Sequence, residues 1–150
     1  MKTLVLIPLL LVSLLVVSCS KSETTDPAAD LSANQKMVST GDWKVTQYLD
    51  SGKDETSDFS LLSVSFNADG SIVVSDGTTT YTGTWTLASA SSSSDDTGYD
   101  DKNHKFTITI AGDKLMQKLS KKWLAVKVTE TEIWLSDDNP ASNEHLHFGR

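Results

Sequence analysis

Cysteine and arginine are nearly absent from this 150-residue sequence, and each scarcity excludes a class of function. The single cysteine, Cys19, permits neither an internal disulfide nor a zinc site built from several cysteines. Arg150 is the one arginine, and 13 Lys+Arg stand against 20 Asp+Glu, for a net charge of -7. Such a chain lacks the basic face that contacts nucleic-acid phosphates, so we expect no nucleic-acid partner. Its charge does not draw it to an anionic membrane surface either.

Catalytic and cofactor-binding motifs are also missing. The sequence contains no G-x-S-x-G, H-E-x-x-H or G-x-G-x-x-G motif and no phosphate-cradling loop. We therefore expect no enzyme activity and no cofactor, although scattered serine, histidine and aspartate residues could still meet in space.

Two clusters of metal-ligand residue types fall short of a recognisable site. His145 and His147 share one face of the last predicted strand, a spacing that can chelate a metal, with His104 or Glu144 as a third ligand. The acidic segment Asp95–Asp101 offers oxygen atoms to Ca²⁺ but lacks the spacing of a calcium loop. We expect solvated side chains at both places and no metal site.

Long apolar runs are confined to the first 18 residues. Leu4 to Val17 forms a 14-residue stretch interrupted by Pro8 and Ser13. It is too short for a bilayer core, which needs roughly 20 residues. Behind a short positive start it fits the apolar region of a secretory signal, so residues 1–18 are predicted to be a signal peptide.

The residues around Cys19, Val16-Val17-Ser18-Cys19, resemble the lipobox of bacterial lipoproteins. The resemblance implies cleavage before Cys19, lipidation of its sulfur and stable attachment to a membrane through two or three acyl chains. An ordinary signal peptide with an incidental Cys19 is the alternative. Ser20 follows the cysteine where inner-membrane lipoproteins often carry aspartate, which implies the outer membrane of the cell envelope and leaves its face open.

The composition changes abruptly after the cysteine. Residues 19–30 contain no large apolar side chain, so they cannot bury enough surface to offset the entropy of ordering. We predict a lipidated cysteine and flexible tether over 19–30 and a folded domain over 31–150. The domain begins with a short helix from Leu31 that Gly41 ends.

From residue 42 onward, apolar and polar residues alternate with period two, which predicts strands. Asn67-Ala68-Asp69-Gly70 and Asp76-Gly77 mark hairpin turns. Leu115 and Leu119 indicate a second short helix near 114–121. Eight strands with mostly short connections predict an all-β fold, an eight-stranded antiparallel up-and-down barrel whose closure removes exposed edges.

Two Gly-x-Trp motifs, Gly41-x-Trp43 and Gly83-x-Trp85, resemble the bacterial lipocalin-like (G-x-W) domain lipoproteins. Three further segments extend the match over about residues 40–149: Phe66-Asn67-x-Asp69-Gly70, Leu119-Ser120-x-x-Trp123 and His145-Leu146-x-Phe148. The resemblance implies a lipocalin-like barrel that binds a ligand and in which these four Gly and Trp residues are structural. It also implies a basic side chain packed across Trp43, for which Arg150 is the candidate.

Strict alternation predicts an inward face of twenty mostly bulky residues. They are Trp43, Val45, Leu62, Val64, Phe66, Ile72, Val74, Tyr81, Trp85, Leu87, Phe106, Ile108, Ile110, Leu124, Val126, Val128, Ile133, Leu135, Leu146 and Phe148. Gln47 is the clear polar candidate on that face, so a polar ligand deep inside would meet few partners. Tyr48 and Trp134 are predicted to point outward. Either the N-terminal helix or the segment around Trp123 covers Trp134, or Trp134 is an exposed platform that binds a sugar ring or a partner protein.

Two functions from different classes fit these predictions. The first is an outer-membrane-anchored lipoprotein that holds a small, largely apolar ligand at one open end of the barrel. The alternative is a filled barrel that contacts a protein or glycan through its outer aromatics and loops. A cavity favours the first function, and an exposed aromatic patch on a filled barrel favours the second.

Overall fold

The computed structural model describes residues 27–89, 104–139 and 141–150. The signal segment, Cys19, Ser20 and the acidic segment Asp95–Asp101 lie outside the described residues. In the ranges that are described, no helix is long and apolar enough to cross a membrane.

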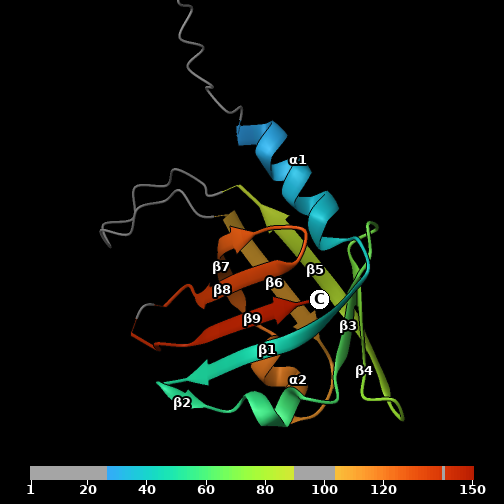
Figure 1. Cartoon of the computed structure of the whole chain (residues 1–150), viewed down its shortest axis with the longest axis vertical. Helices are drawn as coiled ribbons and strands as arrows, with labels where there is room; N and C mark the ends of the chain where they lie inside the picture. The colour runs from blue at the N-terminus through green and yellow to red at the C-terminus, as the bar shows by residue number, and fades with distance from the viewer. Residues whose placement is uncertain (1–26, 90–103, 140) are drawn as a thin grey trace, which may run out of the picture.

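The strands form one closed antiparallel barrel (Figure 1). In chain order the elements are α1 (Pro27–Val38), β1 (Asp42–Asp50), β2 (Lys53–Asp54), the 3₁₀ helix η1 (Thr56–Phe59), β3 (Ser63–Phe66), β4 (Ser71–Ser75), β5 (Thr80–Ala88), β6 (His104–Ile110), α2 (Lys114–Leu119), β7 (Lys122–Val128), β8 (Glu132–Asp137) and β9 (His145–Gly149). The two-residue β2 pairs antiparallel with the end of β1, and each longer strand pairs with the next longer strand along the chain. β9 pairs with β1 from Lys44↔Gly149 to Leu49↔His145, which closes the sheet. The eight longer strands confirm the predicted eight-stranded up-and-down barrel.

The turn between β3 and β4 shows how the sequence sets the strand register. Asn67 donates its backbone N–H to the carbonyl of Ser71 at 2.8 Å, and Gly70 donates to the carbonyl of Asn67 at 3.0 Å. Gly70 has a φ of +85°, which glycine adopts without strain. The predicted hairpin is therefore confirmed at Asn67–Gly70.

The interior is filled by the barrel's own side chains. Phe66 lies at its centre, with ring centroids 5.4–5.5 Å from those of Trp85, Phe106 and Phe148 in edge-to-face arrangements. The largest fully buried side chains are Trp43, Trp123, Tyr48, Phe59, Phe66, Phe106, Phe148, Ile72, Ile108, Met116, Leu119 and Ile133. Burial of each such side chain stabilises the fold by roughly 1.5–3 kcal/mol, so the filled interior is the main source of stability.

Helices cover both ends of the barrel (Figure 1). At one end, Val38 of α1 is fully buried and its carbonyl accepts a hydrogen bond from Trp43 Nε1 at 2.9 Å. At the opposite end, η1 buries Phe59 and α2 buries Met116 and Leu119. The side chain of Asp113 caps α2 by accepting from the N–H groups of the next turn.

A β-bulge in β1 corrects the predicted faces of that strand. Thr46 is an extra residue, because Val45 pairs with Phe148 and Gln47 pairs with His147, the next residue along β9. One extra residue shifts the following side chains to the other face. Tyr48 is therefore fully buried, not outward as predicted, and Gln47 lies outside the core.

A second bulge corrects β7 in the same way. Val126 is the extra residue between Ala125, which pairs with Leu135, and Lys127, which pairs with Trp134. Val126 was predicted to point inward and is 54% exposed, whereas Trp123 and Ala125 are buried. Leu124, also predicted inward, is half-buried.

The first helix begins earlier than predicted. α1 starts at Pro27, four residues before Leu31, so the last residues of the predicted tether 19–30 are helical. Proline is favourable at the first helical position, since no hydrogen bond is required of it there, and Asp30 in the first turn complements the helix dipole.

Candidate functional site

The outer face of β7, β8, β9 and β1 carries a row of side chains that the two bulges flank. Lys127 pairs with Trp134, Trp134 with His147, and His147 with Gln47, one residue from each strand. The bulge residue Val126 stands next to Lys127, and the bulge residue Thr46 stands next to Gln47. Bulges commonly re-aim side chains beside functional sites, so this row is the first candidate surface.

Trp134 and His147 form an aromatic pair at the centre of this row. Their ring centroids are 3.6 Å apart, with the planes tilted by 49°. Lys127 Nζ lies 5.2 Å from the centroid of the Trp134 ring and 2.6 Å from Glu132 Oε2. These contacts hold the indole in one orientation, although Trp134 remains 39% exposed.

A groove of about 530 Å³ lies next to the aromatic pair. Gly149 forms part of its floor and pairs with Lys44 on one side and Glu132 on the other. The Thr46 side chain lies over Gly149, with its methyl carbon 2.9 Å from the position that a Cβ atom would take there. The groove is also lined by Thr46, Thr131, Trp134, His147, Phe148 and Arg150. We call this feature the Trp134 groove.

Side chains of both charges line the Trp134 groove, where the cations Lys44 and Arg150 outnumber the carboxylate of Glu132. Lys127 holds the pKa of Glu132 below its usual value of 4.5, so this carboxylate is ionised at neutral pH and accepts hydrogen bonds. Burial is the main cause that lowers the pKa of His147 below 6.5, and the Glu132 carboxylate opposes that shift. His147 is therefore neutral at pH 7 and can both donate and accept a hydrogen bond.

The Gly41-x-Trp43 motif lies at the end of the barrel that α1 covers. Trp43 is fully buried, and the guanidinium carbon of Arg150 lies 4.2 Å from its ring centroid. The predicted contact between Arg150 and Trp43 is confirmed. The motif therefore has a structural role in closing this end.

The Gly83-x-Trp85 motif serves the packing of β5 against its neighbours. A Cβ atom at Gly83 would lie 2.0 Å from the carbonyl oxygen of Thr109, so only glycine allows β5 and β6 to approach this closely. Trp85 is 5% exposed, stacks on Phe106 with centroids 5.6 Å apart and donates Nε1–H to the carbonyl of Asn67 at 2.9 Å.

The third ligands proposed for His145 and His147 have other partners in the structure. His145 and His147 both lie on the outer face, as predicted. His104 Nε2 is 3.4 Å from Asp30 Oδ2 of α1, and Glu144 is paired with Lys121 at the α2 end. Within the part of the chain that the structure describes, no three His, Cys, Asp or Glu side chains are grouped to hold a metal ion.

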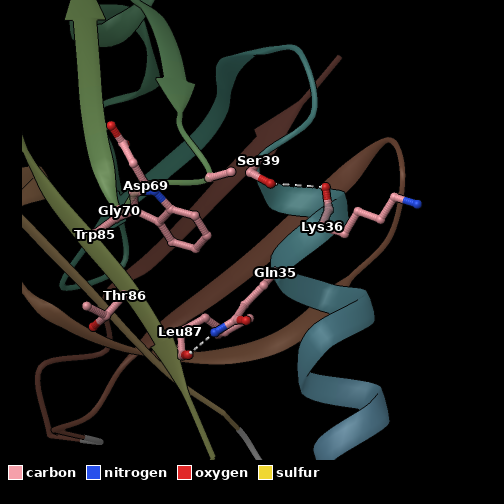
Figure 2. Close-up of a pocket in the computed structure, with 9 residues that line it drawn as sticks. Gln35, Lys36, Ser39, Asp69, Gly70, Trp85, Thr86 and Leu87 are labelled. Carbon is pink, nitrogen blue, oxygen red and sulfur yellow. Dashed lines mark hydrogen bonds between the residues drawn. The ribbon is translucent and has the colours of Figure 1, made fainter.

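A second groove, of about 590 Å³, lies between α1 and the turn that follows β3 (Figure 2). Its lining includes Gln35, Lys36 and Ser39 from α1 and Asp69 and Trp85 from the barrel. Figure 2 shows the Trp85 indole turned toward the last turns of α1, and Gln35 Nε2 donates to the carbonyl of Leu87 at 2.9 Å. We call this feature the α1 groove.

Sequence reasoning identified Trp134 but missed the polar residues around it. Lys44, Glu132 and Gly149 become neighbours only through the register of three strands that are distant in the sequence. Gly149 in an otherwise regular last strand was the one available signal, since a glycine within a strand often marks a close approach or a recess.

Comparisons with known proteins bear on the fold. No protein-family model matches the chain, and no curated protein matches it. Among solved structures, the chain is similar to a DUF4847 family protein from Bacteroides vulgatus. The TM-score is 0.53 at 13% sequence identity, and the match covers 77% of this chain and 95% of that chain. At this identity the likeness shows a shared barrel fold alone.

Proposed function

We propose that the protein is a lipid-anchored protein of the cell envelope that binds a partner through the Trp134 groove. The observation that carries this proposal is an exposed aromatic pair on the outside of a barrel whose interior is filled. A small apolar ligand inside the barrel would have to displace buried side chains at either covered end. An outer groove needs no such rearrangement, so the geometry favours an interaction protein over a carrier.

The test of this function is retention on envelope material from the source cells. Detergent-solubilised full-length protein should be retained, and Trp134→Ala should weaken retention at least about tenfold, because exposed tryptophans often dominate binding. Leu61→Ala is the matched control, since Leu61 is 74% exposed and lies outside the Trp134 groove. Equal retention of the wild type and Trp134→Ala would remove the Trp134 groove as the binding surface.

Anchoring is tested separately. The lone cysteine in a lipobox-like context supports attachment to the outer membrane through lipid on Cys19. Cys19→Ala should release the protein from the membrane fraction or leave the uncleaved precursor. A variant that still fractionates with lipid after a salt wash would show that another feature attaches it.

The α1 groove supports a second candidate, a small amphipathic ligand bound against Trp85. Its volume of about 590 Å³ falls in the range of small-molecule sites, and its lining combines an indole with polar groups. Native mass spectrometry distinguishes the two candidates. A reproducible small-molecule mass that persists in Trp134→Ala would favour the α1 groove, and loss of that mass in Trp134→Ala would assign it to the Trp134 groove.

A further inference from the structure

We propose that α1 is a lid over Trp85, which narrows the α1 groove while it is docked and widens it when it swings away. The inference goes beyond the proposed function, because it concerns how this end of the barrel is covered and not what the Trp134 groove binds. Three features carry it: the small buried surface of α1, two polar contacts far from its fixed end, and a glycine just after that end.

α1 buries little surface against the barrel. Within residues 30–38, Val38 alone is fully buried, while Leu31, Asn34 and Met37 are half-buried and the rest are exposed. Each of the eight longer strands, by contrast, contributes at least two buried apolar side chains to the core. Because apolar burial is the main source of stability, α1 detaches at a smaller cost in free energy than any of these strands.

Two polar contacts hold the part of α1 that lies away from Val38. Gln35 Nε2 donates to the carbonyl of Leu87 at 2.9 Å, and Asp30 Oδ2 lies 3.4 Å from His104 Nε2. We call these two contacts the α1 latch. Asp30 and Gln35 are exposed, so water competes for both contacts. His104 Nδ1 is buried and has no hydrogen-bond partner among the described residues, so the docked form also contains an unsatisfied polar atom.

The fixed end of α1 is followed by a residue suited to a hinge. Gly41 has a φ of +74°, in a region that glycine enters and leaves without strain. Trp43 is fully buried, so the chain beyond the hinge is fixed. Val38 lies close to Gly41 and moves least when α1 swings, whereas Asp30 lies about 12 Å further along the helix at 1.5 Å per residue. The α1 latch therefore holds the part of the helix that moves furthest.

The surface beside α1 is aromatic and apolar. Figure 2 shows the Trp85 indole turned toward α1, with Gln35 reaching across to Leu87. Trp85 is 5% exposed and Leu87 is 4% exposed, although both line the α1 groove. The bond from Trp85 Nε1 to the carbonyl of Asn67 and the stacking on Phe106 hold the indole in place without α1. Movement of α1 therefore uncovers a preformed indole surface, and a ligand that binds this surface selects the open form.

The experiment measures the opening of α1 without a ligand, so its outcome is separate from that of the proposed function. In detergent-solubilised full-length protein, Leu87→Cys places a thiol beside α1, and Leu135→Cys places one in β8 as the control for opening of the whole barrel. We expect a maleimide to label residue 87 at least about tenfold faster than residue 135. Peptide mass spectrometry separates both sites from Cys19. Equal labelling rates would show that α1 opens only when the barrel unfolds and would overturn the lid.

The α1 latch is tested in the Leu87→Cys protein. Gln35→Ala removes the hydrogen bond to the Leu87 carbonyl and should raise the labelling rate about fivefold, the usual effect of one hydrogen bond. Asp30→Asn removes the charge beside His104 and should raise the rate in the same direction. Lys36→Ala is the matched control, because Lys36 is an exposed residue of the same helix outside the α1 latch. A rate that neither latch variant changes, or that Lys36→Ala raises equally, would overturn the latch.

Hydrogen exchange of the protein without cysteine substitutions gives a second measurement. A detached helix of 12 residues is only marginally stable in water, so the amides of α1 should exchange together and faster than those of β5 and β6. Gln35→Ala should speed the exchange of α1 and leave that of the strands unchanged. Protection that rises residue by residue from the N-terminus of α1 would show fraying of the helix end and would overturn the lid.

Discussion

Trp43 is fully buried, and both its indole nitrogen and its ring have a polar partner. Nε1 donates to the carbonyl of Val38, and the Arg150 guanidinium covers the ring at 4.2 Å. Arg150 is held there because its backbone N–H donates to the carbonyl of Thr131 at 3.2 Å. Gly41 has a φ of +74°, and a Cβ atom there would lie 3.0 Å from Arg150 Nη1. The glycine of the motif therefore gives the arginine room to reach the tryptophan.

The contact between Arg150 and Trp43 gives a prediction for a double-mutant cycle. Arg150→Ala should lower the free energy of unfolding by about 1 kcal/mol when Trp43 is present, the usual size of a partly exposed cation–π contact. The loss should be smaller in Trp43→Phe, because a phenyl ring attracts a cation less strongly than an indole does. Urea denaturation of the four proteins measures the coupling. A coupling energy of zero would mean that the Arg150 side chain acts through its Nε hydrogen bond to the carbonyl of Glu130 and not through the Trp43 ring.

At the scale of the element, the two bulges decide which side chains face the core. They place Thr46 and Val126 as extra residues in β1 and β7, the two strands that flank the β8–β9 pair. The same bulges bury Tyr48 and bring Lys127 level with Trp134. The core and the Trp134 groove therefore depend on the same two irregularities.

These bulges also mark the limit of prediction from the sequence. Alternation predicts the inward faces of β4, β5, β6, β8 and β9 correctly, since each keeps its register from end to end. Alternation fails for β1 after Val45 and for β7, because each of these strands contains a bulge. The position of a bulge depends on the pairing with the neighbouring strand and cannot be seen in the alternation of apolar and polar residues. For the same reason Trp134 could be predicted as outward, but not its neighbours Lys44, Glu132 and Gly149.

The close approach of β5 and β6 at Gly83 predicts a large effect of one methyl group. In Gly83→Ala the new Cβ would lie 2.0 Å from the Thr109 carbonyl oxygen and 2.9 Å from Ile110 Cα, so backbone must move. We expect a loss of about 3 kcal/mol in the free energy of unfolding, measured by chemical denaturation. Gly77→Ala is the control: its φ is +89° with no atom within 4 Å, so strain alone should cost about 1 kcal/mol. Similar losses in the two variants would show that the strands separate easily at Gly83.

At the scale of the whole molecule, two glutamates at the α2 end give the barrel opposite responses to pH. Glu55 pairs with Lys118 of α2 and with Lys53, and these cations hold its pKa at about 2 instead of 4.5. Burial and then the neighbouring Asp137 raise the pKa of Glu144 above 4.5, although Lys121 pairs with it and opposes the shift. The two side chains thus favour opposite protonation states in the folded protein.

The direction in which each glutamate changes the stability with pH follows from the difference between its folded and unfolded pKa. The folded protein binds a proton at Glu55 less readily than the unfolded chain does, so the stability that Glu55 contributes is complete above pH 4.5. That contribution is lost as the pH falls from 4.5 toward 2. Glu144 behaves in the opposite way, because its pKa is raised by folding. Its contribution is complete below pH 4.5 and is lost as the pH rises through its folded pKa.

We therefore expect Glu55→Gln and Glu144→Gln to reduce the pH dependence of the free energy of unfolding in different pH ranges. Glutamine keeps the size of each side chain but does not titrate, and it replaces one acceptor oxygen with an NH₂ donor. The pH dependence of the free energy of unfolding is therefore compared, and not its absolute value. Free energies of unfolding from urea titrations across the acid range should fall less steeply below pH 4.5 in Glu55→Gln than in the wild type. In Glu144→Gln they should fall less as the pH rises above 4.5. Each variant serves as the control for the other, since both remove one carboxylate from the same end of the barrel. If both variants follow the pH dependence of the wild type, neither carboxyl changes its pKa on folding. If Glu55→Gln alters the stability above pH 4.5 and Glu144→Gln alters it below pH 4.5, the two pKa shifts have the opposite directions.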